Sequence, residues 1–151
     1  AMNPLTVTLG VTNASFVAQA VDWIPELLYD IIRQAYLHRG FSFVRILQRC
    51  PVFTPGIFAE AVKKPALVEL LVHDDGVVVP EIEAIYKSRI AHDPRDIDRA
   101  RHLADATETI KLGVYFKDPS RPRYEEIRRV TPRTPQERND LLNAELDRYA
   151  V

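Results

Sequence analysis

The first half of the chain alternates between apolar runs and one amphipathic segment. Residues 14–21 (ASFVAQAV) and 41–47 (FSFVRIL) are short and rich in apolar, aromatic and β-branched residues, a composition typical of buried strands. Between them, apolar side chains recur at three- and four-residue spacing over residues 23–39, which predicts a helix. Its expected packed face consists of Ile24, Leu27, Leu28, Ile31, Ile32, Ala35 and Tyr36. We expect Asp22 to cap this helix and Gly40 to end it in a left-handed conformation.

A strand, an amphipathic helix and a second strand in this order predict a βαβ unit. The two strands of such a unit run parallel, and its fold class is α/β. Ligands of parallel sheets bind beyond the carboxyl ends of the strands, and Cys50 follows the second strand closely. The preceding residues 5–13 (LTVTLGVTN) are compatible with a strand or with a helix packed on the sheet.

The second half is more charged and less clearly periodic. Residues 1–80 carry 6 Lys or Arg and 7 Asp or Glu, whereas residues 81–151 carry 14 of each kind. The sequence "TPQE" that starts at Thr134 is a capping box with proline in the first turn, so we expect a terminal helix over residues 134–149. The pattern before it predicts helices over 81–91 and 94–111, and a short strand or an extended arm over 112–116. We therefore expect residues 1–56 to form an α/β portion and residues 57–151 a mainly helical extension.

Composition and missing motifs exclude several classes of function but do not identify one. The chain has 151 residues, 46% of them hydrophobic, which is enough for one core, and its net charge of −1 does not indicate nucleic-acid binding. No apolar run approaches the roughly 18 residues of a membrane span. A lone cysteine rules out an internal disulfide framework and fits a reducing cytosol. The nucleotide-binding, P-loop, nucleophile-elbow and zinc-protease motifs are all absent, so this chain alone builds no complete phosphate or acyl-transfer site.

Taken from the residues alone, Cys50 has three possible roles. It can be a small buried hydrophobic residue, a nucleophile, or one ligand of a metal centre whose other ligands lie elsewhere. The residue pattern favours the buried role, because no base or further thiol accompanies it. Cys-Pro also ends the ligand run of bacterial ferredoxins, which keeps the metal role open.

Other polar groups favour ordinary structural roles. The histidines are not spaced as metal ligands; they are His38, His73, His92 and His102. The densest group of ligand-type residues, residues 73–75 (HDD), reads as a polar turn after an apolar run, and His38 as the last turn of a helix. The arginine-rich arm 121–133 also contains glutamates, which favours a solvated or subunit-bridging arm over a nucleic-acid arm.

Three longer stretches resemble one enzyme family. They are "NPLTVTLGVTNASFVAQAVD" (3–22), "AYLHRGFSFVRILQRCPVF" (35–53) and "LGVYFKDPSRPRYEEI" (112–127). The first two resemble the later part of the β subunit of 2-oxoacid:ferredoxin oxidoreductases, in which an Ala-x-Phe-Val-Ala strand precedes His-(Lys/Arg)-Gly, an apolar strand and Cys-Pro-x-Phe. The third resembles the tail of 2-oxoglutarate-type β subunits. Thr54 departs from the asparagine that the family often has there.

The resemblance implies a function for the complete enzyme. In this family thiamine diphosphate and Mg²⁺ bind between α and β chains, a 2-oxo acid is oxidatively decarboxylated with coenzyme A, and electrons pass through an iron–sulfur cluster to ferredoxin. The resemblance implies that Cys50 is the last of four thiolate ligands of a [4Fe–4S] cluster, and that the other three lie in the earlier half of the β subunit. It also implies that residues 1–56 are the C-terminal part of the thiamine-diphosphate-binding domain, and that residues 57–151 contact other subunits.

This chain lacks the Gly-Asp-Gly motif that holds Mg²⁺-diphosphate and the other cluster cysteines. We therefore expect it to be inactive and to bind neither cofactor alone. Its expected partners are an α subunit, the remaining β-subunit segment and ferredoxin, with no nucleic acid and no membrane, in the cytoplasm. The alternative is a non-catalytic α/β interaction module in which Cys50 is buried and inert.

Overall fold

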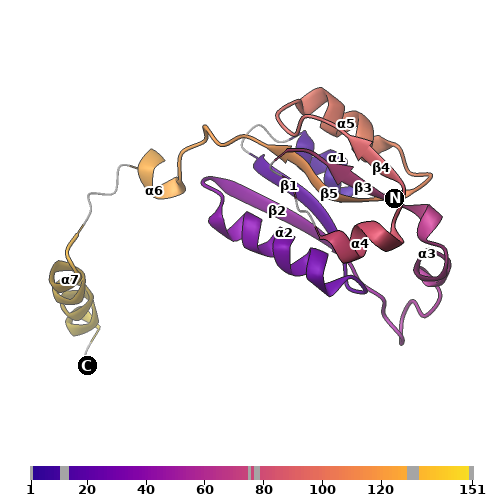
Figure 1. The fold of residues 1–151 in the computed structure, drawn as a ribbon. Helices are drawn as coiled ribbons and strands as arrows, with labels where there is room; N and C mark the ends of the chain where they lie inside the picture. The colour runs from indigo at the N-terminus through magenta and orange to yellow at the C-terminus, as the bar shows by residue number, and fades with distance from the viewer. Residues whose placement is uncertain (1, 11–13, 75, 77–78, 129–132, 150–151) are drawn as a thin grey trace.

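A single five-stranded sheet forms the centre of the molecule (Figure 1). The computed structural model describes residues 2–10, 14–74, 76, 79–128 and 133–149. The strand order is β2-β1-β5-β3-β4, with bounds Phe41–Leu47, Ala14–Val21, Ile110–Lys117, Val68–Val72 and Arg89–Ala91. β2 is parallel to β1, and β3 is parallel to both β4 and β5. β5 is antiparallel to β1, so the sheet consists of two parallel parts that run in opposite directions.

The predicted βαβ unit is confirmed. Both strands, β1 and β2, have the bounds expected from the sequence, and α2 between them spans Pro25–Leu37. Gly40 has a φ of 104°, as expected for the turn that leads into β2. The predicted cap at Asp22 is wrong, because the N-cap is Ile24, which makes no side-chain hydrogen bond to the helix.

The two faces of the sheet are covered by different helices (Figure 1). On one face, α2 and α4 (Pro80–Ile85) pack on the sheet through a cluster that includes Leu27, Ile31 and Ile82. On the other face lie α1 (Pro4–Leu9) and α5 (Ile97–Asp105). The ambiguous segment 5–13 thus contributes a helix, and its residues 11–13 lie outside the described part of the chain. All eight residues of β1 are buried, because the strand has neighbours on both edges and helices on both faces.

Two helices predicted for the second half extend too far. The helix expected over 81–91 ends at Ile85, and residues 89–91 form β4, which pairs with β3. The helix expected over 94–111 is α5, which starts after Asp96 because that side chain accepts the N–H groups of residues 98 and 99. β5 begins already at Ile110. In both places, pairing with β3 decides the conformation of residues whose local pattern was compatible with a helix.

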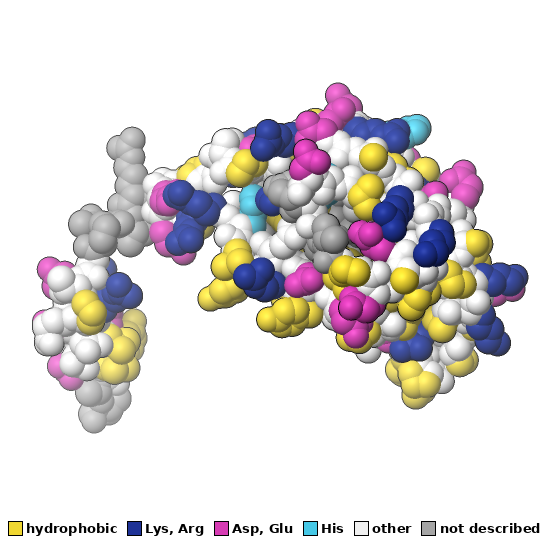
Figure 2. Space-filling view, viewed as in Figure 1, with side chains coloured by type: hydrophobic (Ala, Val, Ile, Leu, Met, Phe, Trp, Pro, Cys, Tyr) yellow, Lys and Arg dark blue, Asp and Glu magenta, His cyan; other side chains and the backbone are white. Residues whose placement is uncertain are grey.

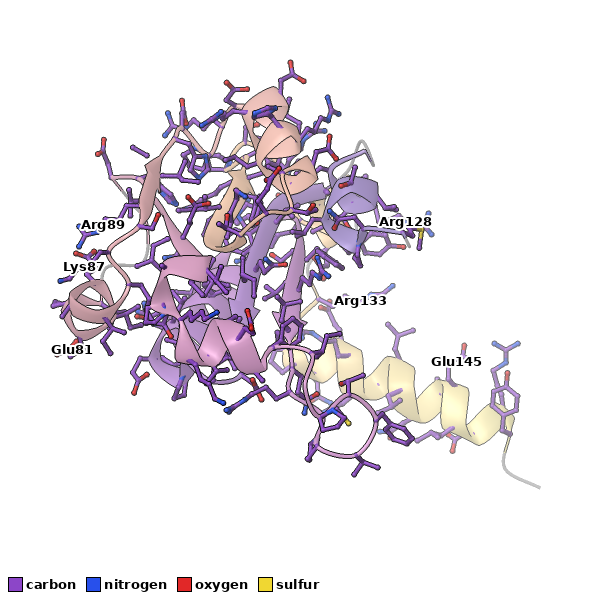
Figure 3. The ribbon with its side chains drawn as sticks, turned by 90° about the vertical axis from the view of Figure 1, so that its right-hand side faces the viewer. Glu81, Lys87, Arg89, Arg128, Arg133 and Glu145 are labelled. Atoms are coloured by element: carbon purple, nitrogen blue, oxygen red, sulfur yellow. The ribbon has the colours of Figure 1, made fainter. Side chains whose placement is uncertain are left out.

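The chain leaves the sheet after β5, so residues 57–151 contribute three of its strands as well as helices. Two short helical segments, α3 (Ala59–Lys63) and η1 (Pro65–Leu67), precede β3, whereas α6 (Tyr124–Ile127) and α7 (Pro135–Arg148) follow β5. The predicted capping box of α7 is confirmed, with reciprocal hydrogen bonds between Thr134 and Glu137. α7 stands apart from the sheet (Figure 1), and Figure 3 labels Arg128 and Arg133 of the arm and Glu145 of α7. The division of the chain at residue 56 stays a prediction.

Candidate functional site

Cys50 lies in a tight loop that follows the carboxyl end of β2. Thr54 donates its backbone N–H to the carbonyl of Cys50 at 3.1 Å, and the two residues form an isolated antiparallel bridge. The side chain is partly exposed, so the expectation that Cys50 is buried is wrong, whereas its reactivity stays a prediction. A partly exposed thiol at the end of a parallel strand can react or bind a ligand.

The loop directs backbone N–H groups at the sulfur of Cys50. Phe53 donates its N–H to Sγ at 3.4 Å. This contact is the largest cause of a lowered pKa for the Cys50 thiol, and the backbone N–H of Val52 contributes in the same direction. Hydrogen bonds that favour the charged form stabilise the thiolate, which is the form that binds metals.

Two side chains at the end of β1 anchor the start of this loop. Asp22 accepts hydrogen bonds from Arg49, from Nε at 3.1 Å and from the backbone N–H at 3.3 Å. The guanidinium of Arg49 lies 5.8 Å from the ring centre of Trp23, and the Trp23 ring in turn lies 5.5 Å from that of Phe58. The sequence did not indicate this anchor, because it depends on the parallel register that brings the ends of β1 and β2 together.

Three of the four histidines lie in two places at the other end of the strands, and His102 lies in the last turn of α5. His38, at the end of α2, places Nε2 at 3.0 Å from the hydroxyl oxygen of Ser15. His73 and His92 follow β3 and β4, and their rings meet edge to face with centres 5.8 Å apart. The sequence did not predict the pair of His73 and His92, because β4 was assigned to a helix. Asp75, the third residue of the predicted polar turn, lies outside the described residues.

An open pocket of about 950 Å³ lies at the carboxyl ends of β3, β4 and β5. Its lining includes two histidines, two carboxylates and two cations, contributed by His73, Asp74, His92, Asp93, Arg95 and Lys117. Nε2 of His92 lies 3.0 Å from the carbonyl oxygen of Val114, and burial lowers the pKa of this histidine. β5 is antiparallel to β1, so the carboxyl ends of β5 and β1 point in opposite directions. The pocket and Cys50 therefore lie at opposite ends of the strands. The balanced lining charge favours neither an anion nor a cation.

Charges of both signs pair along the arm 121–133. Arg121 contacts Asp118 at 3.0 Å, and Arg39 of the body pairs with Glu126. Arg128 lies over the ring of Tyr124 instead, and Arg129 lies outside the described residues. This mixture of charges fits the predicted solvated or bridging arm better than a one-sided basic surface.

The described residues offer no complete metal site and no membrane-spanning helix. Within them, no group of three or more histidine, cysteine, aspartate or glutamate side chains is arranged to hold a metal ion. No helix in the same part of the chain is both long and apolar enough to cross a membrane.

Comparisons with known proteins point to one enzyme. No protein-family model matches the chain. The chain is 39% identical over 70 residues, 46% of its length, to the 2-oxoglutarate oxidoreductase subunit KorB of Mycobacterium tuberculosis, of which the match covers 18%. Its fold is similar to a chain in the structure of 2-oxoglutarate:ferredoxin oxidoreductase from Magnetococcus marinus, which was solved with 2-oxoglutarate, coenzyme A and succinyl-CoA bound. That likeness has a TM-score of 0.60 with 26% identity, and it covers 95% of this chain and 44% of the other.

The predicted resemblance to 2-oxoglutarate-type oxidoreductase subunits is therefore confirmed by sequence and by structure. The chain spans less than half of the length of either relative. The α/β class and the helical C-terminus agree with the same structural relative.

Proposed function

We propose that this chain is part of a 2-oxoacid:ferredoxin oxidoreductase that oxidatively decarboxylates 2-oxoglutarate. The complete enzyme would convert the 2-oxo acid and coenzyme A into acyl-CoA and CO₂, and would reduce ferredoxin. The proposal is supported by the two relatives, whose names include 2-oxoglutarate, and by the bound coenzyme A and succinyl-CoA of the solved one. The chain itself would supply one metal ligand and contacts to other subunits.

The position and surroundings of Cys50 are the observation that carries this proposal. Cys50 is partly exposed, follows a parallel strand and accepts an N–H from Phe53, which favours its thiolate. These properties fit one ligand of a [4Fe–4S] cluster, in which hydrogen bonds to the sulfurs tune the reduction potential. When bound, the cluster would supply one-electron transfer toward ferredoxin.

Residues around Cys50 would position its sulfur for such a cluster. The contact between Asp22 and Arg49 fixes the residue before Cys50, and the hydrogen bond from Thr54 to Cys50 closes the loop behind it. The N–H of Phe53 would donate a hydrogen bond to the thiolate and stabilise its negative charge. These groups hold and orient the ligand, and they take no part in decarboxylation.

Other polypeptides would complete both cofactor sites. A [4Fe–4S] cluster takes four thiolates and this chain has one cysteine, so we propose that the remaining β-subunit segment supplies the other three. Thiamine diphosphate and Mg²⁺ would bind to that segment together with an α subunit. We propose that the enzyme works in the cytoplasm, because a single cysteine fits a reducing compartment.

Reconstitution with the partner polypeptides tests the proposal. The complex should show the visible absorbance of an iron–sulfur cluster, and it should reduce viologen with 2-oxoglutarate and coenzyme A but much more slowly with pyruvate. Cys50→Ala should remove the cluster absorbance and the activity together. Thr54→Ser is the matched control, because it changes the same loop and leaves the sulfur in place.

The proposal would be wrong if Cys50→Ala kept both the absorbance and the viologen reduction. Equal rates with pyruvate and 2-oxoglutarate would overturn the substrate assignment while leaving the cluster ligand intact.

A further inference from the structure

One indole ring contacts both ends of the loop that carries Cys50. The ring belongs to Trp23, which follows β1 by two residues and is the only tryptophan of the chain. At the start of the loop, the guanidinium carbon of Arg49 lies 5.8 Å from the ring centre of Trp23. At its end, the ring centre of Phe58 lies 5.5 Å away, and the two rings are tilted by 39°. We refer to residues 49–58 as the Cys50 loop.

The middle of the Cys50 loop is not fixed by burial. Residues 51–57 are all exposed, and Figure 2 shows hydrophobic side chains at the surface of the loop below α2. Backbone hydrogen bonds from Thr54 to Cys50 and from Ile57 to Thr54 close turns inside the loop. Within the described part of the chain, no hydrogen bond joins residues 51–57 to the sheet. The position of the loop relative to the sheet therefore depends on its two ends.

Trp23 is itself held by the core. It lies between Val21 and Ile24, which are both buried, and its side chain packs against the hydrophobic cluster on the α2 face of the sheet. The backbone N–H of Asp22 donates to the carbonyl of Leu47 at 3.1 Å, which fixes the chain next to Trp23. Aromatic pairs and cation–aromatic pairs both prefer particular arrangements, so an anchored ring can restrain the groups that lie against it.

The contribution of Trp23 comes from its ring and not from its N–H group. Nε1 of Trp23 is buried and has no hydrogen-bond partner among the described residues. A buried donor without an acceptor destabilises the folded state, so this N–H gives no reason for a tryptophan at this position. The contacts of the ring with Arg49 and Phe58 do give one.

We propose that Trp23 is a positioning residue for Cys50, because its ring restrains both ends of the Cys50 loop and thereby fixes the place of the sulfur. With both ends restrained, the N–H of Phe53 stays at 3.4 Å from Sγ. Without the ring, the two ends move independently and this hydrogen bond is broken for part of the time. The proposal rests on the proposed function for what the sulfur binds, whereas its geometric basis needs no cofactor.

A restrained loop also favours a bound cluster. A ligand that is already in place loses less conformational freedom when it binds, so binding is tighter. Hydrogen bonds to the sulfurs help to set the reduction potential of an iron–sulfur cluster. Because such a bond stabilises the more negative, reduced state, a loosened loop should make the cluster harder to reduce.

Four variants separate the ring of Trp23 from its N–H and from general packing. Trp23→Leu removes the ring and keeps an apolar side chain in the core, whereas Trp23→Phe keeps a ring and removes the N–H. Phe58→Leu releases only the end of the Cys50 loop, and it keeps the proposal testable if Trp23→Leu does not fold. Phe116→Leu is the matched control, because Phe116 packs on the other face of the sheet, near the end of β5 that is distant from Cys50.

The first measurement is the rate of Cys50 alkylation against pH, on the isolated chain, in which Cys50 is the only thiol. We expect the midpoint to move to higher pH in Trp23→Leu and, by a smaller amount, in Phe58→Leu, because the Phe53 N–H stabilises the thiolate less. Trp23→Phe and Phe116→Leu should keep the midpoint of the natural chain. Adding Phe58→Leu to Trp23→Leu should move it little further, since both changes remove the same contact.

The second measurement uses the complex reconstituted with its partner polypeptides. An iron chelator should remove the cluster from the Trp23→Leu complex about tenfold faster than from the natural one, which is the size of effect typical of groups that orient a metal ligand. A redox titration followed by electron paramagnetic resonance should give a lower reduction potential. Circular dichroism and thermal melting of each variant separate a displaced loop from loss of folding.

Three outcomes would overturn the proposal. They are an unchanged alkylation midpoint in both Trp23→Leu and Phe58→Leu, a shift in Trp23→Phe as large as in Trp23→Leu, and an equal shift in Phe116→Leu. The second would assign the effect to the N–H, and the third to packing in general. Cys50→Ala distinguishes this proposal from the proposed function. If that variant keeps the cluster, the metal role of Cys50 is wrong, whereas a shifted midpoint in Trp23→Leu would still support the positioning role.

Discussion

Asp22 and Arg49 connect the carboxyl ends of the two parallel strands β1 and β2. The Oδ1 of Asp22 lies 3.1 Å from Nε of Arg49, and Oδ2 lies 3.3 Å from the Arg49 backbone N–H. The contact is next to Cys50, so it links the position of the candidate ligand to the register of the sheet. An exposed ion pair alone contributes little to stability, but this one also satisfies a backbone N–H at the start of the loop.

Asp22→Ala should lower the free energy of unfolding by about 0.5–1 kcal/mol, because it removes the ion pair and the acceptor of the Arg49 N–H. Denaturant unfolding measures this change. Glu60→Ala is the control, because it removes the exposed pair of Glu60 with Lys64 and should have almost no effect. Equal effects of the two variants would mean that Asp22 does not anchor the loop.

The Cys50 thiol should become reactive at a lower pH than a cysteine in an unfolded chain. The backbone N–H groups of Phe53 and Val52 lower its pKa, so the thiolate persists to lower pH in the folded protein. The rate of alkylation, recorded against pH, reports the pKa directly. The same chain in concentrated urea is the control, and a folded midpoint equal to or above the unfolded one would contradict the expectation.

Gly40→Ala should destabilise the protein by more than about 1 kcal/mol. Gly40 has a φ of 104°, which is unfavourable for any residue with a Cβ, and the added Cβ would collide with the hydroxyl of Ser15. Gly56→Ala is the matched control, because a Cβ there meets no atom within 4 Å. Thermal unfolding of the two variants compares them, and similar melting temperatures would show that β2 tolerates a changed turn.

Mild acid should destabilise the protein through two histidines. Burial is the main cause of the lowered pKa of both His38 and His92. Below about pH 6.5 the unfolded chain therefore binds more protons at these positions than the folded chain does, so stability falls as the pH decreases. Unfolding experiments at pH 7.5 and 5.5 measure the change. His92→Gln should make the loss smaller, and an unaltered loss would assign the effect to other groups.

The sequence predicted the βαβ unit well because its local signals agree with its tertiary environment. Residues 14–21 are buried on all sides and 41–47 form the next strand, so apolar runs coincide with strands. The signals fail for β4 and the start of β5, where pairing with β3 overrides a helical pattern. The prediction that Ile32 and Tyr36 lie on the packed face is wrong for a different reason, because these apolar side chains lie on a surface that the described part of the chain leaves exposed.

The candidate site was predictable only in part. The position of Cys50 after a strand followed from the sequence, whereas its contacts with Asp22, Arg49 and the Phe53 N–H depend on register and loop geometry. The pocket beside His73 and His92 was missed, because residues 73 and 92 come together only through the pairing of β3 with β4.

Lys111 is a buried cation within β5, so its substitution tests how much a charged group in the interior contributes to stability. Its side chain is 5% exposed, and Nζ donates to the carbonyl of Ala106 at 2.8 Å and to Thr109 at 3.1 Å, with Glu69 at 3.7 Å. Lys111→Ala leaves these partners without a donor and should cost about 3 kcal/mol in the free energy of unfolding. Lys87→Ala is the control at an exposed position of Figure 3, where we expect a change within about 0.5 kcal/mol. Lys111→Met keeps the aliphatic stem, so if it were as stable as the natural protein, packing rather than charge would explain the role of Lys111.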